Sequence, residues 1–220
     1  SSQEQLERYT TERHASFSQV EREALRQTLS GHIGMALQPI VTVNGAHQTP
    51  TYYEALMRPK NEILNSPMAL LDAAERQQMI GEAASVVLQQ ALRSLQRIPT
   101  GLGLFVNLHP EQLGNPEGLM RDLKPYAGSA DRITLEITER SRLQDIEHWD
   151  ESVRIIGDLG FAIAVDDLGA GYSSLSILAD LRPQFIKLDM SLVRGLHLEP
   201  RKQRLVHLMA TFGAATEAQV

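Results

Sequence analysis

From residue 34 onward, short apolar segments alternate with segments that have the spacing of amphipathic helices. Two apolar segments, 35–43 and 51–57, flank Asn44-Gly45, a pair typical of hairpin turns. Later apolar segments, each after a helix-like segment, are 102–108, 132–138, 161–165 and 185–188. Strands that alternate with helices predict a parallel α/β sheet, either a barrel or doubly wound. No G-x-G-x-x-G or P-loop motif follows the first strands, which weakens the nucleotide-binding doubly wound alternative.

The segments between these strands carry helix signals. Ser66-Pro67 has the order of an N-cap and a first-turn proline. Further helices are expected at 83–95, from 110, at 146–159, from 173 and at 201–214, and residues 219–220 resemble the start of another strand. Residues 1–20 contain few apolar side chains, so we expect a linker helix from an upstream domain. Residues 21–220 are then one domain of a longer protein.

Composition excludes several classes of site. The 220 residues contain no Cys, which excludes disulfides, thiolate zinc sites and Cys nucleophiles, and fits a cytoplasmic protein. The net charge of −6 argues against a nucleic-acid polymer as partner, because such surfaces are basic. No apolar run approaches the ~18 residues of a membrane span, and the polar start lacks a signal-peptide pattern.

Charged and amide side chains recur at or near the carboxyl ends of the apolar segments, with Glu54 in the latter half of its segment. In chain order they are Glu54, Asn107, Glu136, the pair Asp166-Asp167, and Lys187. In a barrel the carboxyl ends of the strands converge on one mouth, where catalytic groups belong. Carboxylate and amide oxygens without His or Cys suit Mg²⁺ or Mn²⁺ better than zinc. The repeated placement therefore predicts a shared metal site.

Each residue also has a simpler interpretation. Glu54 alone is typical of a surface acid on a strand edge. Asn107 could cap the helix that starts near Pro110, a common role of Asn. Lys187 could form a structural ion pair with nearby Asp189. The scattered histidines are interpreted as non-ligands. These alternatives weaken when taken together, because several strands repeat the same placement within otherwise apolar runs.

The stretch 54–58 reads Glu-Ala-Leu-Met-Arg, and here the sequence resembles the EAL family, the cyclic di-GMP phosphodiesterases of bacterial signalling. The resemblance runs from about residue 22 to the end. Further stretches similar to family motifs, in the family's order, are Gln38-Pro39-Ile40, Val106-Asn107-Leu108, Leu135-Glu136-Ile137-Thr138-Glu139, Asp166 to Leu175, and Phe185-Ile186-Lys187-Leu188-Asp189.

The resemblance implies a modified TIM (β/α)₈ barrel whose first strand runs antiparallel to the others, preceded by an N-terminal helix. It implies hydrolysis of cyclic di-GMP to linear pGpG with Mg²⁺ or Mn²⁺, two ions being expected. It also implies a homodimer and a sensory or regulatory domain upstream. The family's E-G-V-E segment, with a further catalytic glutamate, and its last barrel strands would follow Val220, so we expect this chain to hold an incomplete copy.

The same resemblance implies roles for individual residues. Lys187 would position or activate the attacking water, and Glu139 would anchor the loop 168–172, which couples dimerisation to metal binding in the family. Asp167 would serve a second metal ion. The other expected metal ligands are Glu54, Asn107, Glu136 and Asp166, and the expected substrate contacts are Gln38, Leu56 and Arg58.

Some positions depart from the family pattern. Leu168 and Ala170 replace the usual Phe and Thr of the loop, and His109 stands where Ser is common. Two alternatives to the phosphodiesterase stay open. One is a catalytically inactive EAL domain that acts as a cyclic di-GMP receptor. The other is an unrelated metal-dependent barrel, such as an enolase-like lyase, which also places acids and a Lys at strand ends.

Overall fold

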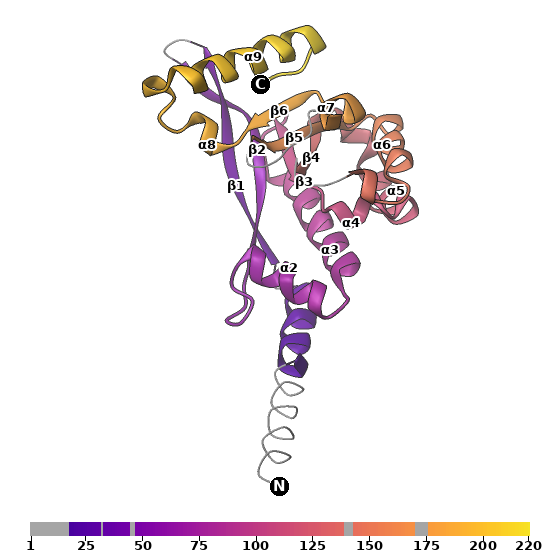
Figure 1. The fold of residues 1–220 in the computed structure, drawn as a ribbon. Helices are drawn as coiled ribbons and strands as arrows, with labels where there is room; N and C mark the ends of the chain where they lie inside the picture. Colours follow the sequence, from indigo (N-terminus) through magenta and orange to yellow (C-terminus); the bar gives the residue numbers. More distant parts are fainter. Residues whose placement is uncertain (1–17, 32, 45–46, 139–142, 170–175) are drawn as a thin grey trace.

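The computed structural model describes residues 18–31, 33–44, 47–138, 143–169 and 176–220. Six strands form one curled sheet, a half-barrel, in which every strand lies beside its neighbour in the chain (Figure 1). The first strand pairs antiparallel with the second and all other pairs are parallel, as predicted. The strands are β1 (Ile33–Asn44), β2 (His47–Pro59), β3 (Gly103–Asn107), β4 (Ile133–Thr138), β5 (Ala162–Leu168) and β6 (Phe185–Leu188).

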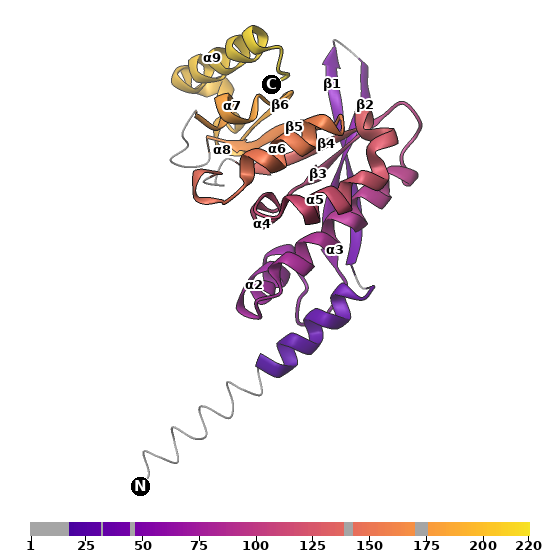
Figure 2. The same cartoon turned by 90° about the vertical axis from the view of Figure 1, so that its right-hand side faces the viewer.

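Helices cover the outer side of the parallel strands. In Figure 2, α3 (Ile80–Arg93), α5 (Pro116–Leu123) and α6 (Trp149–Asp158) lie in front of the sheet. Between these layers is the main core, where Leu88 and Leu135 are fully buried. Further labelled α-helices are α2 (Pro67–Arg76), α4 (Pro110–Leu113), α7 (Ser176–Leu181), α8 (Met190–Val193) and α9 (Pro200–Thr216). Short 3₁₀ helices are η1 (Ser94–Arg97), η2 (Lys124–Arg132), η3 (Leu143–Asp145) and η4 (Leu196–Leu198).

The N-terminal part of the described chain packs at one end of the sheet. Residues 18–29 form a helix that lies at the opposite end of the molecule from α9 (Figures 1 and 2). Its Leu25 is fully buried in a second apolar cluster, which includes Leu70 of α2. The N-cap predicted for α2 is confirmed, because the Ser66 side chain accepts a hydrogen bond from the backbone N–H of Ala69. This arrangement fixes α2 between the N-terminal helix and the sheet.

Several boundaries differ from the prediction. The strands of the β1–β2 hairpin are longer than expected, because antiparallel pairing continues from Ile33 opposite Pro59 to Asn44 opposite His47. Strand β5 continues beyond Val165 through both aspartates and ends before Gly169, whose φ of 99° is left-handed. Helix α6 starts at 149 rather than 146, since the residue before it also has a left-handed backbone. The expected helix start at 173 lies outside the described residues.

The predicted strand start at 219–220 is confirmed as a parallel pairing with β6. The backbone N–H of Ile186 donates to the Gln219 carbonyl at 2.7 Å, and the Gln219 N–H donates to Gln184 at 2.9 Å. Among the described residues, no helix is both long and apolar enough to cross a membrane.

Candidate functional site

The Lys187 side chain joins acids from three other strands. Its Nζ lies 3.1 Å from Oε2 of Glu54 and 3.2 Å from Oδ1 of Asp166, and it also donates to Oε1 of Glu136. Asn107 completes the group, because its Nδ2 donates to Oε1 of Glu54 at 3.4 Å. We call these five residues the acid–lysine centre. Each of the five strands β2 to β6 thus contributes one residue.

Strand pairing explains why these residues meet. Asn107 lies opposite Glu136 in the β3–β4 register, and Glu54 lies opposite the residue two before Asn107. Because side chains two apart on a strand share a face, each of the five residues projects from the concave face. The five predicted residues therefore converge on one face of the sheet, although Glu54 lies within β2 rather than at its end.

Burial controls the protonation of the centre. Glu136 is completely buried, and this burial raises the pKa of its carboxyl to about 8, with Lys187 opposing the rise and Glu54 adding to it. Burial alone would lower the pKa of Lys187, but the carboxylates of Glu136 and Asp166 outweigh it, so the pKa lies above its usual range. Lys187 is therefore a permanent cation at neutral pH.

The oxygen donors of the centre fit a divalent metal. Oε2 of Glu136 is buried and accepts no hydrogen bond, as would suit an oxygen that faces a cation. Carboxylates and one amide are donors that Mg²⁺ and Mn²⁺ prefer. Within the described ranges, no three His, Cys, Asp or Glu side chains form a ready-made metal site, and the Lys187 ammonium lies among the acids.

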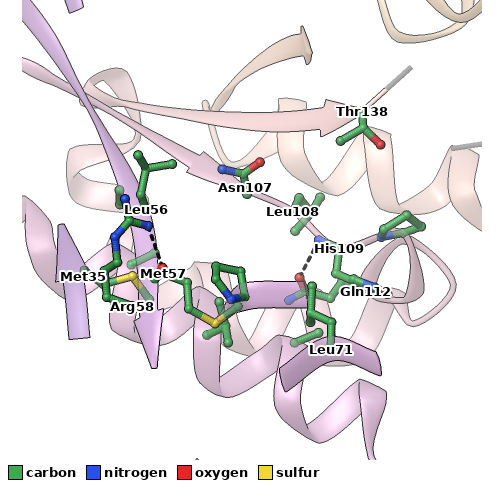
Figure 3. Close-up of a pocket in the computed structure, with 16 residues that line it drawn as sticks. Met35, Leu56, Met57, Arg58, Leu71, Asn107, Leu108, His109, Gln112 and Thr138 are labelled. Atoms are coloured by element: carbon green, nitrogen blue, oxygen red, sulfur yellow. Dashed lines mark hydrogen bonds between the residues drawn. The ribbon is translucent and has the colours of Figure 1, made fainter. Parts of the chain in front are cut away.

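A pocket of about 410 Å³ lies next to the centre, with Asn107 in its wall (Figure 3). Its lining is mostly apolar and comes from β1, β2, α2, α3, the ends of β3 and β4, and the segment after β3. Two of the predicted substrate contacts, Leu56 and Arg58, line it. The Arg58 guanidinium is exposed and donates to the Met57 carbonyl at 2.8 Å. An exposed cation at the edge of an apolar pocket suits a ligand that combines aromatic rings with phosphate.

Three polar residues of the pocket were not predicted from the sequence. Thr138 follows Glu136 by two residues and so shares its face, a signal that alternation along the strand contained. His109 caps α4, since its Nδ1 accepts from the Glu111 N–H at 3.2 Å. Gln112 accepts from the His109 N–H at 3.0 Å (Figure 3). Burial lowers the pKa of His109, so its ring is neutral at neutral pH.

The remaining predicted residues occupy different places. Gln38 lies opposite Glu54 in the β1–β2 register and is exposed. Asp167 has a left-handed φ of 57° where the register of β5 shifts against β6. Glu139 lies outside the described residues, as do 170–172 of its expected loop.

Two of the simpler interpretations do not hold. Asn107 does not cap the helix at 110, because the His109 side chain does so. The described ion pairs of Lys187 are with Glu54, Glu136 and Asp166. Asp189 instead caps α8, where its side chain accepts from the Ser191 N–H at 2.8 Å.

Comparison with known proteins places this geometry in a family. Residues 22–220 match the EAL domain. The chain is 30% identical over 209 residues to the probable cyclic di-GMP phosphodiesterase PdeG of Escherichia coli. The matched region covers 90% of this chain and 41% of PdeG. The chain is 31% identical over 175 residues to the cyclic di-GMP phosphodiesterase PA2567 of Pseudomonas aeruginosa, with 76% of this chain and 30% of that protein covered.

Solved structures agree on the fold. The Xanthomonas citri FimX EAL domain in complex with c-diGMP has a TM-score of 0.78 at 20% identity, with 94% of this chain and 83% of that chain covered. The chain spans less than half of the length of the two relatives above. The family match nevertheless covers most of the chain, from the N-terminal helix to the last residue. The chain therefore belongs to the EAL domain family.

Proposed function

We propose that this chain binds cyclic di-GMP and hydrolyses it to linear pGpG with the help of Mg²⁺ or Mn²⁺, two ions being expected. The observation that carries the proposal is the convergence of three acids, one amide and one lysine beside a mostly apolar pocket. The names of PdeG and PA2567 support cyclic di-GMP as the substrate and a phosphodiesterase reaction.

The acid–lysine centre would hold the metal through Glu54, Asn107, Glu136 and Asp166, and Asp167, next to the centre in sequence, would serve a second ion as the family resemblance implies. When bound, the metal would supply a water of lowered pKa and a positive charge beside the phosphate. The buried Oε2 of Glu136 supports this role, because a buried carboxyl oxygen without a partner is costly. The donor set of the centre supports the assignments of its own four residues.

The chain's own residues would orient the reaction. Lys187 would keep a fixed positive charge beside the attacking water and hold the acids in one place. Arg58 would bind a phosphate, and the apolar pocket would accept a base. Overall, the oxygen of water bonds to phosphorus, the bond to a 3′ oxygen breaks, and that oxygen receives a proton, which gives pGpG.

The proposal includes the wider organisation of the protein. Residues 21–220 would be the phosphodiesterase domain, and residues 1–20 a linker from an upstream sensory or regulatory domain. Gln38 would contact the dinucleotide, while Glu139 would anchor the loop after β5 in a homodimer. The chain covers 41% of PdeG and 30% of PA2567, so these relatives contain segments outside the matched region, as the proposed upstream domain requires.

Chromatographic detection of pGpG, after incubation with cyclic di-GMP and either Mg²⁺ or Mn²⁺, tests the proposal. We expect turnover by the wild type, near-complete loss in Glu54→Gln, and unchanged turnover in Glu62→Gln, an exposed acid beyond the end of β2. Calorimetric binding of cyclic di-GMP without turnover would instead assign the receptor role. Failure to bind any cyclic dinucleotide, with activity on a carboxylate substrate, would revive the lyase alternative.

A further inference from the structure

Three aromatic rings meet inside the curled sheet. The ring centroids of Tyr52 and Phe105 are 5.2 Å apart, those of Phe105 and Phe185 are 5.0 Å apart, and those of Tyr52 and Phe185 are 5.4 Å apart. All three pairs meet edge to face, the geometry that aromatic pairs favour. Strands β2, β3 and β6 are thereby joined by one set of contacts, which we call the aromatic floor.

The aromatic floor lies directly below the acid–lysine centre. Each ring precedes a residue of the centre by two positions on its strand, and these pairs are Tyr52 with Glu54, Phe105 with Asn107, and Phe185 with Lys187. Residues two apart on a strand share a face and differ by about 6.6 Å in height. The rings therefore form the next layer of the concave face toward the amino ends of the strands.

The neighbouring positions leave room for the rings. On the other two strands the residues two before Glu136 and Asp166 are small, Thr134 and Ala164, and both are buried. On β3, Gly103 lies opposite Tyr52, and a Cβ added there would come within 2.3 Å of the Tyr52 ring. Small residues at these three positions leave space for the rings from β2, β3 and β6 to meet on the concave face of the sheet.

We propose that the aromatic floor is a positioning element of the active centre, an inference that rests on the proposed function. It excludes water from the lower side of the centre and fixes the strands that carry Glu54, Asn107 and Lys187. A site held by rigid neighbours keeps its ligands at productive distances, and loosening such neighbours weakens metal binding. The rings touch neither the ligand nor the metal in this role.

The test compares the same substitution at three buried or half-buried phenylalanines. Phe105→Leu and Phe185→Leu each remove a ring from the floor, whereas Phe161→Leu removes a ring that is 5% exposed in the main core and lies outside the floor. Tyr52→Phe keeps all three rings. Phe185 is only half-buried, so its variant decides the matter if Phe105→Leu does not fold.

Two measurements are made on each variant. The first is Mn²⁺ affinity by electron paramagnetic resonance. The second is the rate at which the Lys187 ammonium exchanges its protons with water, measured by ¹⁵N NMR on the metal-free chain. The Lys187 signal is the one that is missing from the spectrum of Lys187→Met. We expect the two floor variants to bind Mn²⁺ about tenfold more weakly and to exchange the ammonium protons about tenfold faster. Phe161→Leu and Tyr52→Phe are expected to stay within about twofold of the wild type.

Equal changes in the floor variants and in Phe161→Leu would overturn the proposal, because the effect would then be a general loss of core packing. Unchanged values in both floor variants would overturn it as well. If the wild type binds no Mn²⁺, the proposed function fails, and the ammonium exchange in the metal-free chain still decides whether the floor holds Lys187 in place.

Discussion

The Nζ atom of Lys187 lies 3.1 Å from Oε2 of Glu54, although 133 residues separate the two in the chain. The contact links β6 to β2 across the concave face of the curled sheet, in which three other strands lie between them. It also gives the acids of the centre a counter-charge in the metal-free chain. Lys187 therefore has a structural role beside its proposed role in the reaction.

Lys187→Met is expected to destabilise the metal-free chain by about 3 kcal/mol, because it leaves the buried Glu136 carboxyl beside two other acids. Added Mg²⁺ should restore more stability to the variant than to the wild type, since a second cation can replace the ammonium. Urea unfolding with and without Mg²⁺ measures both effects. Lys202→Met is the matched control, because its side chain is 27% exposed like that of Lys187 but pairs with exposed Glu199. Equal losses in the two variants would contradict this account.

Metal affinity is expected to depend on pH. Burial raises the pKa of Glu136 to about 8, so below that pH a metal must displace a proton from this carboxyl. The affinity for Mg²⁺ should therefore rise about tenfold per pH unit between about pH 6 and 8 and then level off. Calorimetry in buffers of different ionisation enthalpy counts the released proton. Glu136→Gln should abolish the release, and a flat profile in the wild type would contradict the assignment.

The histidine cap of α4 can be tested by stability. His109→Ala removes the side-chain acceptor for the Glu111 N–H and should lower the free energy of unfolding by about 1 kcal/mol. His109→Asn supplies another good capping side chain and should recover most of the loss. Chemical denaturation of the three proteins provides the measurement. If the Asn variant is as unstable as the Ala variant, the loss comes from pocket packing rather than from the cap.

The N-terminal helix is attached through a buried polar clamp. Glu21 is 4% exposed and accepts from Arg76 Nη2 at 2.5 Å and from Gln77 Nε2 at 3.0 Å. The hydrogen bond from Arg76 holds the pKa of Glu21 below its usual value, so its stabilising effect is present at neutral pH and is lost as the pH falls through that lowered pKa. Glu21→Ala should cost about 1–3 kcal/mol.

Hydrogen exchange of residues 18–29 is the direct readout of the clamp. We expect protection in this helix to fall in Glu21→Ala while the amides of β3 and β4 keep theirs. The control is Glu23→Ala, because Glu23 is exposed two positions along the same helix. Unchanged protection in Glu21→Ala would show that the apolar contacts of Leu25 alone hold the helix.

Local patterns predicted most of the fold. The apolar runs located all six strands, and Ser66-Pro67 located the start of α2, because both signals depend on neighbouring residues. The excess length of the β1–β2 hairpin was not predictable, since pairing of exposed strands depends on the partner rather than on an apolar run. The end of β5 was also misplaced, because two aspartates look like a strand end while pairing continues to Leu168.

The site was predictable as a set of residues and not as a set of contacts. The apolar runs placed Glu54, Asn107 and Glu136 at or near strand ends, but the ion pairs of Lys187 depend on how far the sheet curls. The role of His109 as a cap was missed because Asn107 is the better capping residue by statistics. The aromatic floor was missed because its rings come from three separate runs that each look like ordinary core.

The most direct test of the central claim is turnover of cyclic di-GMP by Glu136→Gln, measured as pGpG formed in Mg²⁺ or Mn²⁺, with ligand binding measured in parallel. If the acid–lysine centre is catalytic, the wild type forms pGpG, and the variant still binds cyclic di-GMP while its turnover falls by at least about a hundredfold. If Glu136→Gln instead forms pGpG as fast as the wild type, the account is contradicted, because the reaction would then occur away from this centre.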